Sequence, residues 1–223
     1  MRSRAPPESA EPERFAADPR WQREPVGAAA AAGPGAAIDT PLGALRATAR
    51  VGDRVLGIES AASFAHPGGA RLLAWADGQM RAELLRVSIR PELPPGMRVD
   101  GCVAAAWRLR ATAPLALELR CGWDALPGGE AGSPESGQDL DAQGWWLPRW
   151  RASLGMPDLG SATRYLPEGF RVRVALAPGE AFAVHFVVAW RAGPVGAEDA
   201  STWFAVDCPP AQVRASLGAP SGA

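Results

Sequence analysis

Lysine is absent from this 223-residue chain, and all 23 of its basic residues are arginine. The 24 acidic residues bring the formal net charge to −1, so the chain has no excess of positive charge. Proteins dedicated to nucleic acids usually carry a basic stripe or tail. We therefore expect no nucleic-acid partner. Because alanine, glycine and proline are abundant, we attribute the missing lysine to a G+C-rich coding bias and expect a bacterial source.

Cysteine and histidine are scarce as well. The three cysteines are spread widely and form neither a disulfide framework nor a Cys-x-x-Cys metal motif. His66 precedes a Pro-Gly-Gly loop and His185 lies in an apolar segment, so neither has the spacing of a metal ligand or of a base beside a nucleophile. We expect structural roles for both histidines, no metal and no cofactor, and we favour a protein without catalytic activity.

Long apolar runs are missing too. The run Ala28–Ala32 is too short to span a bilayer, and acidic residues rather than an apolar stretch follow the first arginines. The sequence also lacks a glycine-rich phosphate loop and a repeat of fixed period. These absences predict a cytoplasmic protein with no membrane span.

The clearest positive signal is the segment from Phe170 to Trp190. Apolar residues occupy every second position on both sides of Pro178-Gly179. A period of two predicts two β-strands. Proline followed by glycine suits a type II turn, which fits a tight hairpin poorly. The two strands therefore either join through a wider loop or cross from one sheet to another.

Shorter segments repeat this pattern. Asp77-Gly78 between two apolar runs predicts a hairpin, and the apolar phase changes near Glu83, where we expect a bulge. Pairing of Val99–Ala111 with Leu115–Trp123 would place their apolar residues on one face and their charged residues on the other. Cys102 and Cys121 then face opposite sides, which argues against a disulfide between them unless a bulge intervenes.

These patterns predict an all-β fold, an antiparallel β-sandwich of immunoglobulin-like type. We expect a disordered N-terminal arm over residues 1–37, a sandwich domain over 38–207 that ends in a strand at Ser201–Val206, and a C-terminal tail over 208–223. Within the arm, Phe15 and Trp21 lie among charged residues. Isolated aromatics in such a tail sometimes anchor a partner protein, although a solvated tail is the simpler interpretation.

Residues 124–169 are predicted to form one long irregular loop, since they open with an acidic stretch rich in glycine, proline and serine. A cluster of three tryptophans, Trp145, Trp146 and Trp150, lies in this loop beside arginines, where the rings either cover one end of the core or contact a ligand. In the acidic stretch, Asp139 and Asp141 share the first spacing of a calcium loop but lack its later ligands. A solvated acidic loop is therefore favoured over a calcium site.

Three functions remain open from the sequence. The leading hypothesis is a non-enzymatic binding or assembly subunit that contacts another protein, or associates with itself, through the tryptophan-rich loop, the N-terminal arm or a sheet edge. The alternative is a carbohydrate-binding module in which the same tryptophans stack on sugar rings. A hydrolase with loop carboxylates is the third. The candidate binding residues are Trp145, Trp146, Arg149, Trp150, Phe15 and Trp21.

One short segment resembles known modules. The turn Leu176–Glu180 and the alternating strand after it resemble the proline-glycine-glutamate turn and strand common in bacterial immunoglobulin-like β-sandwiches. The segment is also similar to part of the N-terminal β-sandwich modules attached to some glycoside hydrolases. The resemblance implies a fold and carries over no functional residue.

Overall fold

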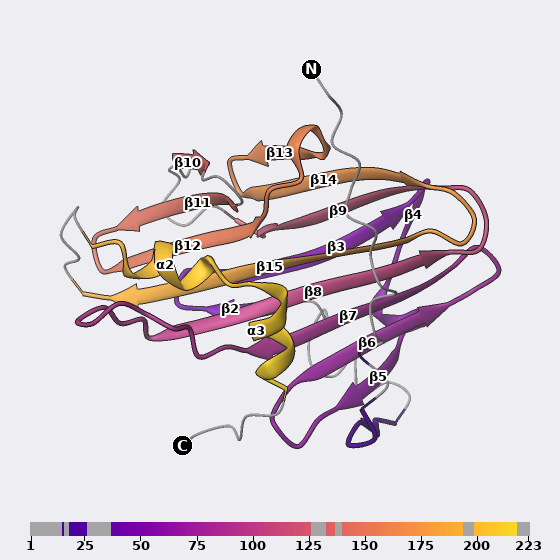
Figure 1. The fold of residues 1–223 in the computed structure, drawn as a ribbon, viewed down its shortest axis with the longest axis horizontal. Coiled ribbons are helices and arrows are strands. Elements are labelled where there is room, and N and C mark those ends of the chain that lie inside the picture. Colours follow the sequence, from indigo (N-terminus) through magenta and orange to yellow (C-terminus); the bar gives the residue numbers. More distant parts are fainter. Residues whose placement is uncertain are drawn as a thin grey trace.

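The computed structural model describes residue 15 and residues 18–25, 37–125, 133–136, 140–193 and 199–217. These residues form two antiparallel β-sheets that pack face to face, with two short helices outside them (Figure 1). The all-β class predicted from the alternating segments is therefore confirmed, and the sheets form a β-sandwich.

The larger sheet has nine strands in the order β1-β5-β6-β7-β8-β15-β12-β11-β10. In chain order its strands are β1 Gln22–Arg23, β5 Ala62–Ala65, β6 Arg71–Ala76, β7 Met80–Ser88, β8 Gly101–Ala111, β10 Ser133–Ser136, β11 Leu140–Leu147, β12 Trp150–Pro157 and β15 Ala181–Ala192. All neighbouring pairs are antiparallel. The hairpin predicted at Asp77-Gly78 is confirmed as the connection between β6 and β7.

The smaller sheet has six strands in the order β13-β14-β9-β3-β2, with β4 also paired to β3. Its strands are β2 Ala37–Thr40, β3 Gly43–Val51, β4 Arg54–Val55, β9 Leu115–Trp123, β13 Thr163–Leu166 and β14 Gly169–Leu176. Two short 3-10 turns, Ile58–Ser60 and Gly160–Ala162, lie in the connections.

A first hydrophobic core fills the space between the sheets. Alternate residues of both sheets point into it, which is why the strands read as alternating in the sequence. Among its fully buried side chains are Leu45, Trp107, Leu119, Leu154, Phe170 and Phe186.

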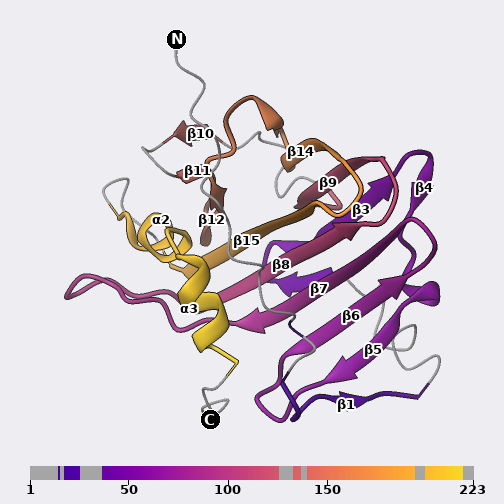
Figure 2. The ribbon, with the colours of Figure 1, turned by 45° about the vertical axis from the view of Figure 1, so that its right-hand side comes forward.

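A second hydrophobic core lies on the outer face of the larger sheet, beneath helices α2 (Ser201–Val206) and α3 (Pro210–Ala215) (Figure 2). Leu84 points into the first core and Leu85 into the second. The register of β7 with both of its neighbours is continuous, so the bulge predicted near Glu83 is wrong. The apolar phase changes there because both faces of the strand are buried.

The pairing predicted for Val99–Ala111 with Leu115–Trp123 is also wrong. β8 pairs with β7 and β15, whereas β9 pairs with β14 and β3 in the other sheet. Trp107 and Leu119 both point into the first core, from opposite sheets. Alternation fixes the inward face of a strand but not its partner. In the same way β14 and β15 lie in different sheets, which confirms the crossing proposed for Phe170 to Trp190.

The long irregular loop predicted over residues 124–169 contains strands β10 to β13 instead. β11 and β12 are buried on both faces for most of their length, so neither shows the period of two. Small residues such as Gly144 and Gly155, which leave room for covering side chains, looked like loop residues in the sequence.

The chain ends differ from the prediction as well. Residues 18–25 of the expected disordered arm include β1, which pairs with β5. Ser201–Val206, predicted as the last strand, is helix α2, because its apolar residues Ala205 and Val206 pack on the second core. Cys208 and Val213 of the expected tail are buried in that core too.

Candidate functional site

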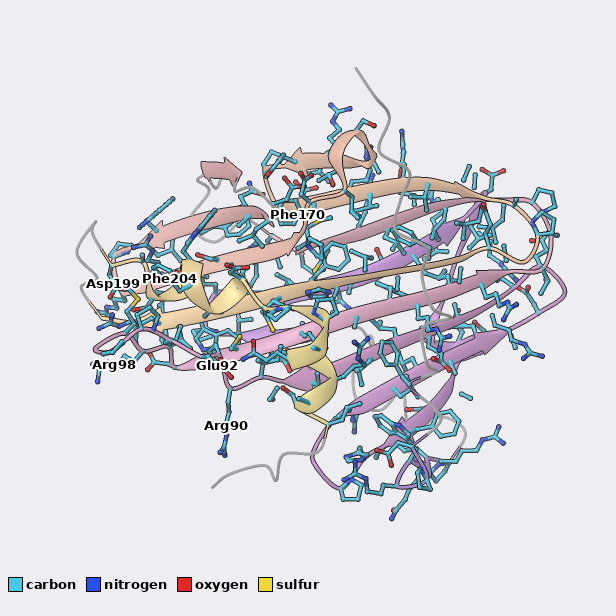
Figure 3. The ribbon with its side chains drawn as sticks, viewed as in Figure 1. Arg90, Glu92, Arg98, Phe170, Asp199 and Phe204 are labelled. Carbon is cyan, nitrogen blue, oxygen red and sulfur yellow. The ribbon has the colours of Figure 1, made fainter. Side chains whose placement is uncertain are left out.

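An aromatic surface lies on the outer face of the larger sheet, where α2 packs on β12, β15 and β11. Its members are Trp146 of β11 and Trp203 and Phe204 of α2. The exposed fraction is 39% for Trp146 and 43% for Phe204, and Trp203 is half-buried against the second core. Figure 3 shows Phe204 at the end of the sandwich where Arg98 and Asp199 also lie.

Helix α2 is held in place by contacts at its start and along its length. The Asp199 carboxylate accepts a hydrogen bond of 2.8 Å from the backbone N–H of Ser201 and forms an ion pair with Arg191. The hydroxyls of Ser153 and Thr202 are 2.8 Å apart in a buried hydrogen bond. With Thr202, Ala205 and Val206 facing the sheet, the helix period turns Phe204 outward.

Trp146 is fixed on the strand surface by its neighbours. The Arg151 guanidinium, on the residue paired with Trp146, lies 5.1 Å from the centroid of the indole ring as a cation–π contact. A side chain at Gly144 would meet the Trp146 ring at 3.0 Å, so the glycine allows the ring to lie along β11. Arg149 is exposed in the adjoining turn between β11 and β12. The surface is therefore ordered rather than loose.

The other two predicted tryptophans point away from this surface. Trp145 is 2% exposed and lies in the first core, where its ring meets Trp123 edge to face at 5.8 Å. Trp150 is half-buried against the same core. The premise of a loop that presents all three tryptophans is wrong, because they lie on strands whose alternation turns Trp145 inward.

The predicted anchors of the N-terminal arm, Phe15 and Trp21, pack against the second core of their own chain. The indole N–H of Trp21 donates to the Phe15 carbonyl at 2.8 Å, and its ring meets the His66 ring edge to face at 5.0 Å. The Asp18 carboxylate lies 3.6 Å from Nε2 of His66, and the hydrogen bond from Arg20 holds the pKa of Asp18 well below its ordinary value. These contacts fasten the segment to the sandwich.

His185 is buried beneath the link between α2 and α3. Its Nε2 lies 2.7 Å from the Cys208 carbonyl, to which it donates in the neutral tautomer. Burial lowers the pKa of His185 below its ordinary value of 6.5, although the bond to Cys208 opposes the shift. Burial also raises the pKa of Cys208 to about 11. Both groups are therefore uncharged at neutral pH and serve packing.

This burial predicts a pH dependence of stability. The unfolded chain takes up a proton on His185 near pH 6.5, whereas the folded chain resists it to lower pH. The contribution of the neutral ring is complete above pH 6.5 and is lost as the pH falls through the folded-state pKa. We expect the free energy of unfolding to decline more steeply below pH 6.5 in the native protein than in a His185→Gln variant, as measured by urea denaturation. Identical slopes would contradict this assignment.

Asp141 and Gln143 lie on the inner face of β11. The Asp141 carboxylate accepts a hydrogen bond of 2.6 Å from the Tyr165 hydroxyl, and Gln143 donates to the Leu166 carbonyl at 3.0 Å. Burial, together with that carboxylate, raises the pKa of Tyr165. Asp139, the other half of the considered calcium pair, lies outside the described residues. Within the described part of the chain, no group of three potential metal-ligating side chains is present.

An open cleft of about 400 Å³ lies at the edge of the larger sheet, between β1, β5 and β6. Glu24 and Glu59 both line it. Glu24 accepts a hydrogen bond of 2.5 Å from the Ser63 hydroxyl and lies 3.6 Å from Arg71. Its carboxylate is therefore held by the fold, and it also ties β1 to the sheet.

The fold and this surface define an all-β sandwich whose larger sheet is covered on its outer face by two short helices. No family model matches the sequence, and no curated protein matches it. Among solved structures, the fold is similar to a putative kojibiose phosphorylase from the human microbiome, with a TM-score of 0.50 and 8% sequence identity.

The likeness covers 77% of this chain and 26% of that protein, so the chain spans about a quarter of the length of the phosphorylase. At such low identity the likeness shows the fold alone. In the described residues, no helix is long and apolar enough to cross a membrane.

Trp203 and Phe204 were missed as site residues because their segment was predicted to be a strand. A signal was present in the neighbouring strands. Runs such as Ala104–Ala106 and Phe186–Ala189 are apolar at every position, which indicates a sheet buried on both faces and therefore requires a covering element.

Proposed function

We propose that this β-sandwich is a non-enzymatic assembly module that binds another protein through the aromatic surface formed by Trp146, Trp203 and Phe204. The observation that carries the proposal is the exposure of Trp146 on β11 and of Phe204 on α2, two elements that contact each other on the outer face of the larger sheet. Exposed aromatic side chains fixed on regular elements supply contact area at a low cost in conformational entropy. The exposed Arg149, in the turn that follows β11, adds the arginine that protein interfaces also favour.

The likeness to solved structures supports a module of this kind. In the phosphorylase, the matched part is about a quarter of the chain, so there the fold forms one part of a longer polypeptide. The immunoglobulin-like relationship stays a proposal that rests on the turn Leu176–Glu180 and the strand after it. A bacterial source and a cytoplasmic location belong to the same proposal and rest on composition.

Carbohydrate binding is the second candidate, and one observation favours it. The ring of Trp146 is 39% exposed, and exposed aromatic rings can stack on sugar rings. With Trp145 buried, however, the surface lacks the second stacking ring that the sequence suggested. We therefore favour protein binding over carbohydrate binding, because protein binding also explains the exposure of Phe204.

The proposal predicts that Trp146→Ser combined with Phe204→Ser abolishes association while the domain stays folded. The tagged native chain and the double variant are compared by affinity capture and by sedimentation velocity, which also detects self-association. Val55→Ser is the matched control, since Val55 is 52% exposed but lies on β4 of the other sheet. A native chain that is monomeric and captures nothing specific contradicts the proposal. Fluorescence that shifts with a glycan in the native chain only would favour the second candidate.

A further inference from the structure

The outer face of the smaller sheet carries a grid of arginines, here called the arginine face. Residues at the alternate positions of its strands point into the first core, and the positions between them point outward. The outward positions hold Arg46 and Arg50 on β3, Arg120 on β9, Arg164 on β13, and Arg171 and Arg173 on β14. Helices α2 and α3 lie on the other sheet, so neither of them covers this face (Figure 2).

Three of these arginines lie directly opposite one another across neighbouring strands. Arg164 pairs with Arg171, and Arg171 pairs with Arg120. Neighbouring strands are about 4.8 Å apart, and like charges directly opposite destabilise a sheet. The row therefore concentrates positive charge, and an anionic partner would reduce the repulsion between these guanidinium groups.

Acidic side chains neutralise only part of the face. Glu118 accepts hydrogen bonds from Arg173 at 2.6 Å and Arg120 at 3.0 Å, which hold the pKa of Glu118 below its ordinary value against the opposing effect of partial burial. Asp124 binds Arg46 at 2.6 Å.

Three arginines of the face have no ion pair among the described residues. Within the described residues, no ion pair or side-chain hydrogen bond forms at Arg50, Arg164 or Arg171. The Nε of Arg171 is buried and has no hydrogen-bond partner there. Among the described residues, nothing neutralises the charge of these three guanidinium groups.

The face also has a depression. An open hollow of about 480 Å³ lies between Arg50 and Arg173, and its lining includes the small residues Gly52, Ala116 and Ala175. The missing side-chain bulk leaves room for a ligand group beside the guanidinium groups.

We propose that the arginine face binds an acidic segment of another polypeptide. Arginine recognises carboxylates with two parallel hydrogen bonds. Arg171 and Arg173 are two residues apart on one strand, about 6.8 Å, which is also the spacing of alternate carboxylate-bearing residues in an extended peptide. The chain's net charge of −1 conceals this concentration of positive charge.

Two features favour an acidic polypeptide over a nucleic acid. Asp39, Glu118 and Asp124 are interspersed with the arginines, so the positive charge does not form the continuous basic stripe typical of nucleic-acid proteins. The outward positions of β3, β9, β13 and β14 also hold no aromatic side chain on which bases could stack.

The test compares a short glutamate-rich peptide with an oligodeoxythymidine of the same formal charge, each fluorescently labelled, by anisotropy at low salt. We expect the peptide to bind more tightly, and its affinity to fall as salt is added. In the triple variant Arg50→Gln, Arg164→Gln and Arg171→Gln, the affinity should fall by about tenfold or more. These three positions leave the Glu118 and Asp124 pairs intact, which protects the fold, and circular dichroism verifies it.

The matched control removes the same charge elsewhere through Arg81→Gln, Arg90→Gln and Arg214→Gln, three exposed arginines outside the arginine face. It should bind the peptide as the native chain does. An equal loss in this control, no peptide binding at all, or tighter binding of the oligonucleotide would overturn the proposal. Because the aromatic surface lies on the other sheet, each of these results is independent of the proposed assembly function.

Discussion

Replacing Trp145 with alanine is expected to lower the free energy of unfolding by about 3–5 kcal/mol. Its side chain is 2% exposed and packs against Trp123 in the first core, so the truncation leaves a cavity that the sheets cannot close. Since domains are stable by only about 5–15 kcal/mol, the loss is a large share of the total. Urea denaturation followed by circular dichroism measures it.

Two variants serve as controls for Trp145→Ala. Trp146→Ala removes the neighbouring, exposed ring and its cation–π contact, and should cost about 1 kcal/mol or less. Trp145→Phe keeps most of the packing and removes an indole N–H that has no hydrogen-bond partner among the described residues, so it should restore most of the stability. Equal costs at positions 145 and 146 would contradict the placement of Trp145 in the core.

Gly169→Ala is expected to be the second large loss, about 2–4 kcal/mol. Gly169 begins β14 with a φ of +148°, in a region that favours glycine, and a Cβ there would lie 2.2 Å from the Cys121 carbonyl oxygen. The obstacle is backbone, which cannot rotate away as a side chain can. The close approach sets β14 against β9 just where Phe170 enters the first core (Figure 3).

The matched control is Gly179→Ala in the connection between β14 and β15. Gly179 also has a positive φ, of +86°, but a Cβ there has nothing within 4 Å. It should therefore cost only the backbone strain, about 1 kcal/mol. Thermal unfolding of both variants separates the two contributions. If Gly169→Ala is no more destabilising than Gly179→Ala, the close packing of β14 on β9 is wrong.

Alternation in the sequence was sufficient to predict strands that bury one face. β9 and β14 of the smaller sheet alternate, and the sequence identified their inward residues correctly. The sequence could not predict which strands pair with each other. Trp107 of β8 and Leu119 of β9 show the same alternation whether their strands pair or face each other across a core.

Strands buried on both faces lose their period, and this explains the largest errors. The sequence predicts a loop for β11 and β12 and a strand for α2. Because α2 covers these strands, their outer face is apolar as well, and the alternation that would identify them as strands is lost. Trp146 was identified as a candidate because it belongs to a cluster of tryptophans beside arginines. Phe204 could not be identified in this way, because its exposure depends on a short helix that only tertiary packing stabilises. The arginine face was not predicted for another reason. The net charge is a sum over the whole chain and does not show where charges of one sign gather on the surface.

The most direct test of the proposed assembly function is site-specific photo-crosslinking. A photoreactive amino acid is placed at position 204 in place of Phe204 and, as a control, at position 55 in place of Val55, which lies on the other sheet and is 52% exposed against 43% for Phe204. The proposal predicts a discrete crosslinked protein from position 204 and none from position 55. The absence of a crosslinked product from position 204, or the same products from both positions, would contradict a protein-binding surface at Trp146 and Phe204.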